Sequence, residues 1–420
     1  MRSVAITGMG LVCPLGNSVA DAVANGEAGR SGIRGCERHL WGEYGAGIRS
    51  RVAGTVEGLD VSRYVPPRFA GSYDPAVVFA LAATREAIDG AALDFTGELG
   101  ERTAVVLGVA APGSHTYHHA LHAAFVERAA HELPGRVSLN ISGNMPAALV
   151  ALEHGLRGPN LGIVNACASG AAAIVVGADL IRTGRADVVV AGGTEACIGL
   201  VLLGSMGNAG AVNPTADPER ASKPFSLDRA GLVMAEGAGV VVLESLEAAL
   251  ARGARIHAEI LGDAITNDAH HVYHPDAEGK HWGRVMELAL RAARVLPCEV
   301  DFVSAHAAST PRGDLTETLA LKRVLGARAF EVPVSATKSM HGHAYGAAGA
   351  IETVLAIAAA EKGVFLPTIN LTAPDPECDL DYVANRSRPR HGEVLLKNSF
   401  GFGGTNACLV IRTASAAVIM

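Results

Sequence analysis

The chain of 420 residues is poor in aromatic and charged side chains and contains no uninterrupted apolar run long enough to cross a membrane, which takes about 18 residues. Aromatic residues make up 5% and charged residues 18% of the chain, so the charged share lies below the usual quarter. The 35 basic and 42 acidic side chains give a formal charge of −7, and no basic run occurs. These absences argue against nucleic acid, an anionic membrane surface and a membrane span. An apolar share of 49% excludes disorder and predicts a large core.

Paired cysteines are also missing, because the seven cysteines are scattered and no Cys-x-x-Cys occurs. This pattern favours neither a zinc ribbon nor a disulfide framework, and seven free thiols are best kept in a reducing cytoplasm. Apolar residues 4–15 after Arg2 imitate a signal peptide only loosely, since Gly8, Gly10 and Pro14 interrupt them. We expect residues 4–8 to form a first β-strand instead.

Short β-branched runs alternate with Ala- and Leu-rich stretches along the whole chain, which predicts an α/β fold. The expected strands are 104–109, 162–165, 186–191, 239–243, 256–261, 300–304, 332–336, 393–398 and 407–412. The expected helices are 74–89, 169–183, 282–295, 314–325 and 349–362. Two polar, His-containing segments, 112–134 and 267–281, interrupt this pattern, and such loops often carry binding groups.

The two series of elements look alike, so we interpret the chain as a diverged duplication of one α/β unit. The halves would be residues 1–250 and 251–413, meeting near residues 246–254. The alternative is that any α/β protein looks self-similar at this level of detail.

Cys167 stands between the expected strand 162–165 and the helix that starts at Ser169, among Ala and Gly residues. A thiol at a helix N-terminus meets unpaired amides and the positive end of the helix dipole, which favour the thiolate and would lower its pKa. The arrangement is similar to a nucleophile elbow with sulfur in place of oxygen. The alternative is a small buried side chain before an Ala-rich helix, a common fate of free cysteine.

Two histidines follow strands of the second half: His306 after 300–304, and His343 in a glycine-rich turn after 332–336. The carboxyl ends of strands are where α/β sheets present catalytic groups, so Cys167, His306 and His343 form a candidate set drawn from both halves. Either histidine alone could be structural. A metal site is the rival interpretation, although no His-Glu-x-x-His motif occurs. Its candidate ligands would be His270, His271, His274, His281, His341 and His343.

Residues 400–406 read Phe-Gly-Phe-Gly-Gly-Thr-Asn and join two expected strands. No helix or lysine follows in the order that a phosphate-binding loop requires. Glycines on both sides of Phe402 would let the backbone approach a ligand closely while the ring swings. The alternative is a tight hairpin with two buried rings.

With these motifs in order, the chain resembles the β-ketoacyl-acyl-carrier-protein synthases, the condensing enzymes of fatty-acid and polyketide synthesis, and most closely their elongating Cys-His-His class. The resemblance extends from Ile6-Thr7-Gly8 to the last strand. It implies the thiolase fold, in which two duplicated α/β halves form five αβαβα layers, usually in a dimer. The motifs that carry it are residues 166–170, 190–193, 306–317, 338–349 and 398–406.

The resemblance also implies roles. Cys167 would take the acyl chain from acyl carrier protein, and the amides of Cys167 and Phe402 would form the oxyanion hole, with Phe402 as gate and Phe400 in support. His306 and His343 would bind the malonyl thioester oxygen. Lys338, paired with Glu352, would order the site, and Thr310 would grip the pantetheine arm. The substrates would be malonyl and acyl thioesters. No metal and no organic cofactor is expected, since phosphopantetheine arrives on the carrier protein.

Several positions depart from the family pattern and leave the substrate open. Ala308 replaces a hydroxyl-bearing residue, His341 replaces Thr, Tyr273 replaces a common Thr, and residues 108–119 lack the usual glycine pattern. Fatty-acid synthesis and a specialised type II polyketide or polyene pathway both remain open, as do a homodimer and a heterodimer with a related ketosynthase. A non-catalytic chain-length factor would lack Cys167. A thiolase would need a second catalytic cysteine, but Cys408 lies inside an expected strand.

Overall fold

The computed structural model describes residues 2–40, 42–69 and 71–413. Ten strands in this part of the chain form one continuous mixed sheet in two groups of five, joined by three residue pairs between β1 and β8. The first group runs in the order β5 (Asn160–Ile163), β4 (Thr103–Gly108), β6 (Val188–Glu195), β7 (Gly237–Ser245) and β1 (Val4–Val12). The second runs in the order β10 (Val334–Ser335), β9 (Phe302–Ser304), β13 (Val394–Gly401), β14 (Thr405–Thr413) and β8 (Ala258–Asn267).

The two groups of strands have the same topology. β4 pairs parallel with β5 and β6, as β9 does with β10 and β13. β7 pairs antiparallel with β1 and β6, as β14 does with β8 and β13. Order and direction therefore repeat strand for strand, which confirms the expected duplication of an α/β unit. The boundary between residues 250 and 251 stays a prediction.

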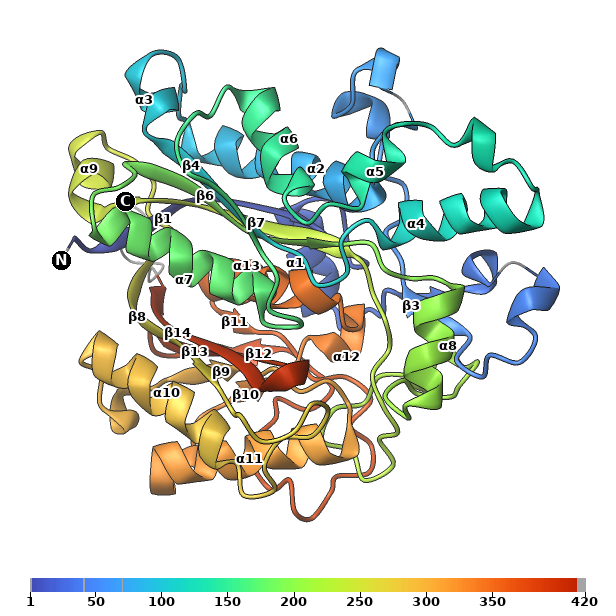
Figure 1. Ribbon diagram of the computed structural model, residues 1–420. Coiled ribbons are helices and arrows are strands. Elements are labelled where there is room, and N and C mark those ends of the chain that lie inside the picture. The colour runs from blue at the N-terminus through green and yellow to red at the C-terminus, as the bar shows by residue number, and fades with distance from the viewer. Residues whose placement is uncertain (1, 41, 70, 414–420) are drawn as a thin grey trace.

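Helices cover the outer faces of both groups and fill the space between them (Figure 1). α2 (Pro75–Ala91) and α6 (Met145–His154) cover the first group, and α10 (Lys280–Ala293) and α11 (Pro311–Leu325) the second. α7 (Ser169–Arg182) and α13 (Tyr345–Glu361) pack against each other in the central layer. Small residues make this contact possible, since a Cβ added at Gly349 would lie 2.9 Å from the Ala171 Cβ. The result is the expected αβαβα order of five layers.

The remaining elements are short or peripheral. They are α1 (Val19–Glu27), β2 (Ile33–Gly35), β3 (Val52–Gly54), α3 (Glu98–Glu101), α4 (Ser114–Leu121), α5 (Val137–Asn140), α8 (Leu200–Asn208), α9 (Leu246–Ala251), α12 (Lys338–His341), β11 (Val364–Phe365), β12 (Arg388–Pro389) and the 3-10 turn η10 (Phe402–Gly404).

Each strand and helix expected from the sequence coincides with one in the structure, with shifted ends. The main error concerns residues 112–134, which we interpreted as an irregular polar segment although they contain α4 and a π-helical turn, His122–Val126. The alternation of His with Ala, Leu and Tyr there has a helical spacing that the polar composition conceals. Residues 268–279, by contrast, form a loop as expected.

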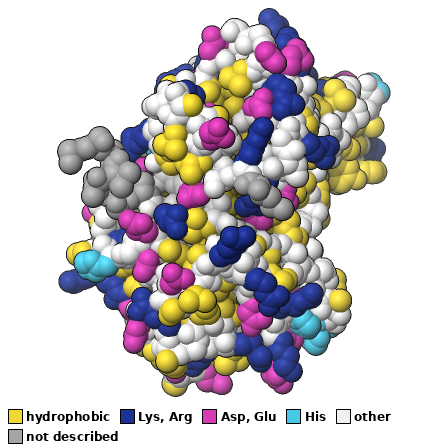
Figure 2. All heavy atoms as spheres, turned by 90° about the vertical axis from the view of Figure 1, so that its left-hand side faces the viewer, with side chains coloured by type: hydrophobic (Ala, Val, Ile, Leu, Met, Phe, Trp, Pro, Cys, Tyr) yellow, Lys and Arg dark blue, Asp and Glu magenta, His cyan; other side chains and the backbone are white. Residues whose placement is uncertain are grey.

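On one face of the molecule, basic and acidic side chains are interspersed among apolar ones (Figure 2). Within the described residues, every helix is too short or too polar to cross a membrane.

Candidate active site

Cys167 lies in the turn between β5 and α7, and the backbone of this turn is strained. Ala166 has a φ of +46°, a conformation that costs free energy for a residue with a Cβ and is often found at functional sites. The Ser169 hydroxyl holds the turn closed, accepting from the Asn165 amide at 2.8 Å and donating to the Ala166 carbonyl at 2.6 Å. From the other half, the Thr405 hydroxyl donates to the Asn165 carbonyl at 2.9 Å. The elbow expected from the sequence is therefore present, and both halves fix it.

His306 follows β9 in a buried loop that α11 holds in place. The backbone amides of His306 and Ala307 donate to the two carboxylate oxygens of Glu317, at 2.9 and 2.7 Å. The Asn398 side-chain amide donates to the same carboxylate at 3.0 Å, and the Lys338 ammonium donates to the His306 carbonyl at 2.5 Å. Four donors thus fix the backbone that carries the imidazole.

His343 lies between α12 and α13, where its backbone exchanges hydrogen bonds with a neighbouring segment. Its amide donates to the Val233 carbonyl at 2.7 Å, and its carbonyl accepts from the Ala235 amide at 2.9 Å. The Tyr345 amide donates to His343 Nδ1 at 3.2 Å. A neutral imidazole that accepts at Nδ1 carries its proton at Nε2. The two imidazoles face each other edge to face, with 5.3 Å between the ring centroids of His306 and His343.

A fully buried cluster of three charges lies behind the histidines. Lys338 forms an ion pair with Glu352, and Lys397 from β13 reaches the same carboxylate at 2.8 Å. All three side chains are at most 1% exposed, and the cluster carries one net positive charge. Burial alone would raise the pKa of Glu352, but the charges of Lys338 and Lys397 outweigh it and hold that pKa below its usual value.

The glycine loop after β13 places two phenylalanines differently. Phe400 is buried and stacks on Trp282 with 3.9 Å between ring centroids, and its ring meets His306 edge to face at 5.7 Å. Phe402 contacts Tyr273 edge to face at 5.7 Å. Between the two rings, a Cβ on Gly401 would lie 3.0 Å from the Cys167 amide nitrogen, so only glycine lets the loop approach the elbow this closely.

The predicted residues meet in one cavity of about 370 Å³, which Cys167, His306, His343, Phe400, Phe402 and Thr310 all line. Of the departures from the family pattern, Ala308 and Tyr273 also line it, whereas His341 does not. His341 is fully buried, and its Nε2 lies 3.1 Å from the Thr337 hydroxyl. The buried Arg229 supports the wall at Thr310, donating to the backbone carbonyls of Thr310 and Pro311 at 3.2 and 2.7 Å.

The prediction of a lowered thiol pKa is wrong for the free enzyme. Burial raises the pKa of Cys167 to about 11, although the Lys338 charge and the amides of Phe402 and Cys167 itself lower it in part. Burial likewise lowers the pKa values of His306 and His343 well below the usual range, helped by the charge of Lys338. The site at neutral pH therefore holds a protonated thiol next to two neutral imidazoles, and the imidazoles can accept its proton.

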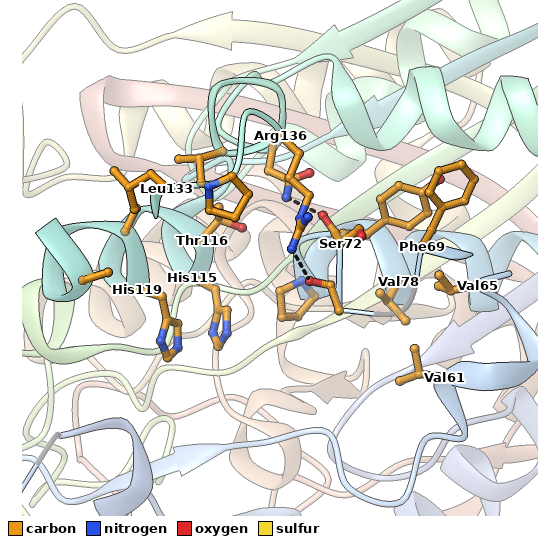
Figure 3. Close-up of a pocket in the computed structure, with 18 of the residues that line it drawn as sticks. Val61, Val65, Phe69, Ser72, Val78, His115, Thr116, His119, Leu133 and Arg136 are labelled. Atoms are coloured by element: carbon orange, nitrogen blue, oxygen red, sulfur yellow. Dashed lines mark hydrogen bonds between the residues drawn. The ribbon is translucent and has the colours of Figure 1, made fainter. Parts of the chain in front are cut away.

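A second cavity of about 560 Å³ lies between α2 and α4, where His115, His119, Arg136 and Phe69 surround an otherwise aliphatic space (Figure 3). The residues that line it include none of the predicted catalytic side chains, so its size does not make it the reaction site. Across the described residues, no group of three His, Cys, Asp or Glu side chains is arranged to hold a metal. His271 instead stacks on His274 with 4.8 Å between ring centroids.

Sequence reasoning missed two buried ionisable groups near the site. Lys397 is a cation inside the apolar strand β13, and that contrast is a signal that could have revealed it. Glu195 ends β6, and its carboxylate accepts from the amides of Ala110, Ala111 and Gly346. Burial raises the pKa of Glu195 to about 7. Nothing in its sequence neighbourhood announces this role.

Comparisons with known proteins agree with the site. Residues 1–249 match the family described as beta-ketoacyl synthase, N-terminal domain, and residues 257–372 match its C-terminal domain. The 3-oxoacyl-acyl-carrier-protein synthase 2 of Synechocystis sp. is 37% identical over 412 residues, covering 98% of each chain.

Two solved structures extend the likeness to three dimensions. One is a type II polyketide synthase acyl-carrier protein in complex with its ketosynthase bound to the hexaketide; the matched chain has a TM-score of 0.90 at 33% identity, covering 99% of this chain and all of that one. The other is the ishigamide ketosynthase/chain length factor, with a TM-score of 0.88 at 35% identity and the same coverage. The chain therefore belongs to the β-ketoacyl synthase family, the condensing acyltransferases that its motifs resemble.

Proposed function

We propose that the protein condenses an acyl chain held on Cys167 with malonyl-acyl-carrier-protein to give 3-oxoacyl-acyl-carrier-protein and carbon dioxide. The observation that carries this proposal is the meeting of Cys167, His306 and His343, from three distant segments, in one cavity. A thiol supplies the covalent acyl carrier, and two neutral imidazoles supply donors for a developing oxyanion.

In the first half-reaction, the Cys167 sulfur attacks the carbonyl carbon of the incoming acyl thioester. The thiol proton passes to a neutral imidazole of the cavity and then to the leaving pantetheine sulfur. The new C–S bond forms as the old one breaks. The backbone amides of Phe402 and Cys167, which lie within range of the sulfur, would stabilise the tetrahedral oxyanion. Phe402, beside the cavity mouth and in contact with Tyr273, would open to admit the chain.

In the second half-reaction, the malonyl carboxylate leaves as carbon dioxide and its electron pair moves onto the thioester carbonyl. The Nε2–H of His343 and the His306 imidazole would donate to that oxygen. The resulting carbanion attacks the acyl carbon on Cys167, and the sulfur leaves and recovers a proton. Lys338 acts as a positioning residue, because its ammonium holds the His306 carbonyl. These steps need neither a metal nor an organic cofactor, and the pantetheine arm comes with acyl carrier protein.

The substrate would enter on an acyl carrier protein. Thr310 and the exposed Arg312 line the cavity mouth, where a hydroxyl and a guanidinium suit a phosphopantetheine arm and an acidic carrier surface. One solved relative is, by its title, a carrier protein in complex with its ketosynthase.

A second subunit would cover the edge strand β5. This strand ends the sheet, and Leu161 and the adjacent Val164 are 38% and 59% exposed, an unprotected apolar edge. The subunit could be another copy of this chain or a related ketosynthase, as in the ketosynthase/chain length factor relative. All seven cysteines are free, which suits a cytoplasmic enzyme. Sedimentation of the purified chain alone distinguishes the homodimer from a chain that needs a paralogue.

The reaction is tested by mixing the protein with octanoyl- and malonyl-acyl-carrier-protein and measuring carbon dioxide and the carrier-bound product. The proposal predicts 3-oxodecanoyl-carrier product with the wild type and none with Cys167→Ala. Release of carbon dioxide without a carbon–carbon bond, over several chain lengths, would contradict it. The same assay with a polyketide carrier protein separates fatty-acid synthesis from a specialised pathway.

A further inference from the structure

Tyr345, the first residue of α13, has three unusual features beside the reaction site. Its φ is +41°, a conformation that is an outlier for a bulky aromatic residue. Its ring stacks on His343 with 5.1 Å between centroids and 15° between planes. It is only 5% exposed, yet among the described residues none lies within hydrogen-bond distance of its hydroxyl. Strain of this kind persists where the surroundings hold it in place, and such sites are often functional.

The surroundings of the hydroxyl are apolar and adjoin the nucleophile. Tyr345 belongs to the buried cluster that also contains Cys167, Cys197, Leu203 and Ala308. The nearby Glu195 is not a free partner, because its carboxylate already accepts from three backbone amides, including that of Gly346 at 3.0 Å. Burial and the neighbouring thiols raise the pKa of Tyr345 well above its usual value, so its hydroxyl keeps its proton and can donate.

An unpaired hydroxyl in this position carries a free-energy cost that a ligand oxygen would remove. The one group that the proposed reaction brings into the cluster around Cys167 is the acyl chain on its sulfur. A saturated chain offers no acceptor beyond the thioester carbonyl and would leave the Tyr345 hydroxyl unpaired. A chain with a hydroxyl or keto oxygen near its thioester end would pair with it.

We propose that Tyr345 is a specificity-determining residue whose hydroxyl hydrogen-bonds an oxygen substituent of the acyl chain on Cys167. The preferred substrates are therefore acyl chains that retain oxygen near the thioester, rather than fully reduced ones. This inference rests on the proposed condensation. Sites built to bond a substrate hydroxyl discriminate strongly against chains that lack it.

The test compares chains of one length: octanoyl, 3-hydroxyoctanoyl and 5-hydroxyoctanoyl thioesters of acyl carrier protein. The rate of Cys167 acylation is followed by intact-protein mass spectrometry. At least one hydroxylated chain is expected to acylate the wild type about tenfold faster than octanoyl or more. Tyr345→Phe is expected to abolish that ratio by slowing only the hydroxylated chain. Tyr382→Phe is the matched control, because Tyr382 is also buried but lies in another cluster with its hydroxyl 2.8 Å from that of Thr318.

The outcomes separate this inference from the function beneath it. Equal acylation by all three chains in the wild type overturns the role of Tyr345 and leaves the condensation standing. A preference that survives Tyr345→Phe overturns it as well. Absence of acylation by every chain refutes the proposed function and this inference together. Loss of the preference in Tyr345→Phe but not in Tyr382→Phe supports the assignment.

Discussion

The buried cluster of Lys338, Glu352 and Lys397 yields a prediction about which member stabilises the protein most. The Lys397 ammonium lies 2.8 Å from the Glu352 carboxylate, and Lys338 contacts the same carboxylate. Glu352→Gln would leave two buried ammonium groups facing each other without a counter-charge. Breaking a buried ion pair by removing one partner costs about 3–5 kcal/mol, so we expect at least that loss in the free energy of unfolding.

Lys397→Met perturbs the same cluster in the opposite sense. It leaves Lys338 and Glu352 as a neutral pair and replaces an ammonium by an apolar side chain of similar length. Exchanging buried charge for apolar packing is often close to neutral, so we expect a loss of no more than about 2 kcal/mol. The lost contact is a 3.2 Å hydrogen bond to the Ser399 hydroxyl, together with one to the Asn398 carbonyl.

Urea unfolding of the wild type and both variants, followed by circular dichroism, measures the two losses under identical conditions. The order predicted is wild type, then Lys397→Met, then Glu352→Gln, with the second step the larger. If Lys397→Met lost as much stability as Glu352→Gln, the carboxylate would not be the centre of the cluster and the argument from charge balance would fail. A Glu352→Gln variant as stable as the wild type would refute it as well.

Three further predictions concern the chemistry of the site. Because burial raises the pKa of Cys167 to about 11, its alkylation by iodoacetamide should rise about tenfold per pH unit between about pH 7 and pH 9, measured on the Cys167 peptide; a plateau near neutral pH would contradict this. Gly401→Ala should slow Cys167 acylation at least about tenfold, because the new Cβ would push against the Cys167 amide that the oxyanion needs; an unchanged rate would show that the amide is not used. The lowered pKa values of His306 and His343 keep both neutral, so malonyl decarboxylation should stay flat from about pH 8 to about pH 6, and a fall centred near pH 6.5 would mean that they titrate normally.

The same lowered pKa values link stability to pH. The two imidazoles remain neutral in the native state while they take up protons in the unfolded state below about pH 6.5. Their contribution to stability is therefore present above that pH and lost as the pH falls further.

The sequence predicted the architecture because the repeating elements carry strong local patterns. The apolar strand before Cys167 and the small residues after it define an elbow, and the strand before His306 places it at a sheet end. Local pattern could not reveal which distant groups meet in the core. The pairing of Lys397 with Glu352 depends on β13 lying beside α13, which only the tertiary fold determines. The thiol pKa was mispredicted for the same reason, since the helix N-terminus is a local feature while the burial that outweighs it is not.

Helical α4 was hidden by its composition rather than by its spacing. Its four histidines gave the segment a polar character that suggested a loop, yet residues 114–121 contain neither Gly nor Pro and fold as a helix. The strain at Tyr345 was equally invisible, because a positive φ at an aromatic residue contradicts its own local preference.

The covalent acyl-enzyme at Cys167 is the central claim, and intact-protein mass spectrometry tests it most directly. After exposure to an acyl-carrier thioester, the wild type should gain the mass of one acyl group, located on the Cys167 peptide, and lose it on addition of malonyl-acyl-carrier-protein. Cys167→Ala should gain nothing. A wild type that stays unmodified over a panel of chain lengths, or an adduct that maps to the exposed Cys298 instead, would contradict the account.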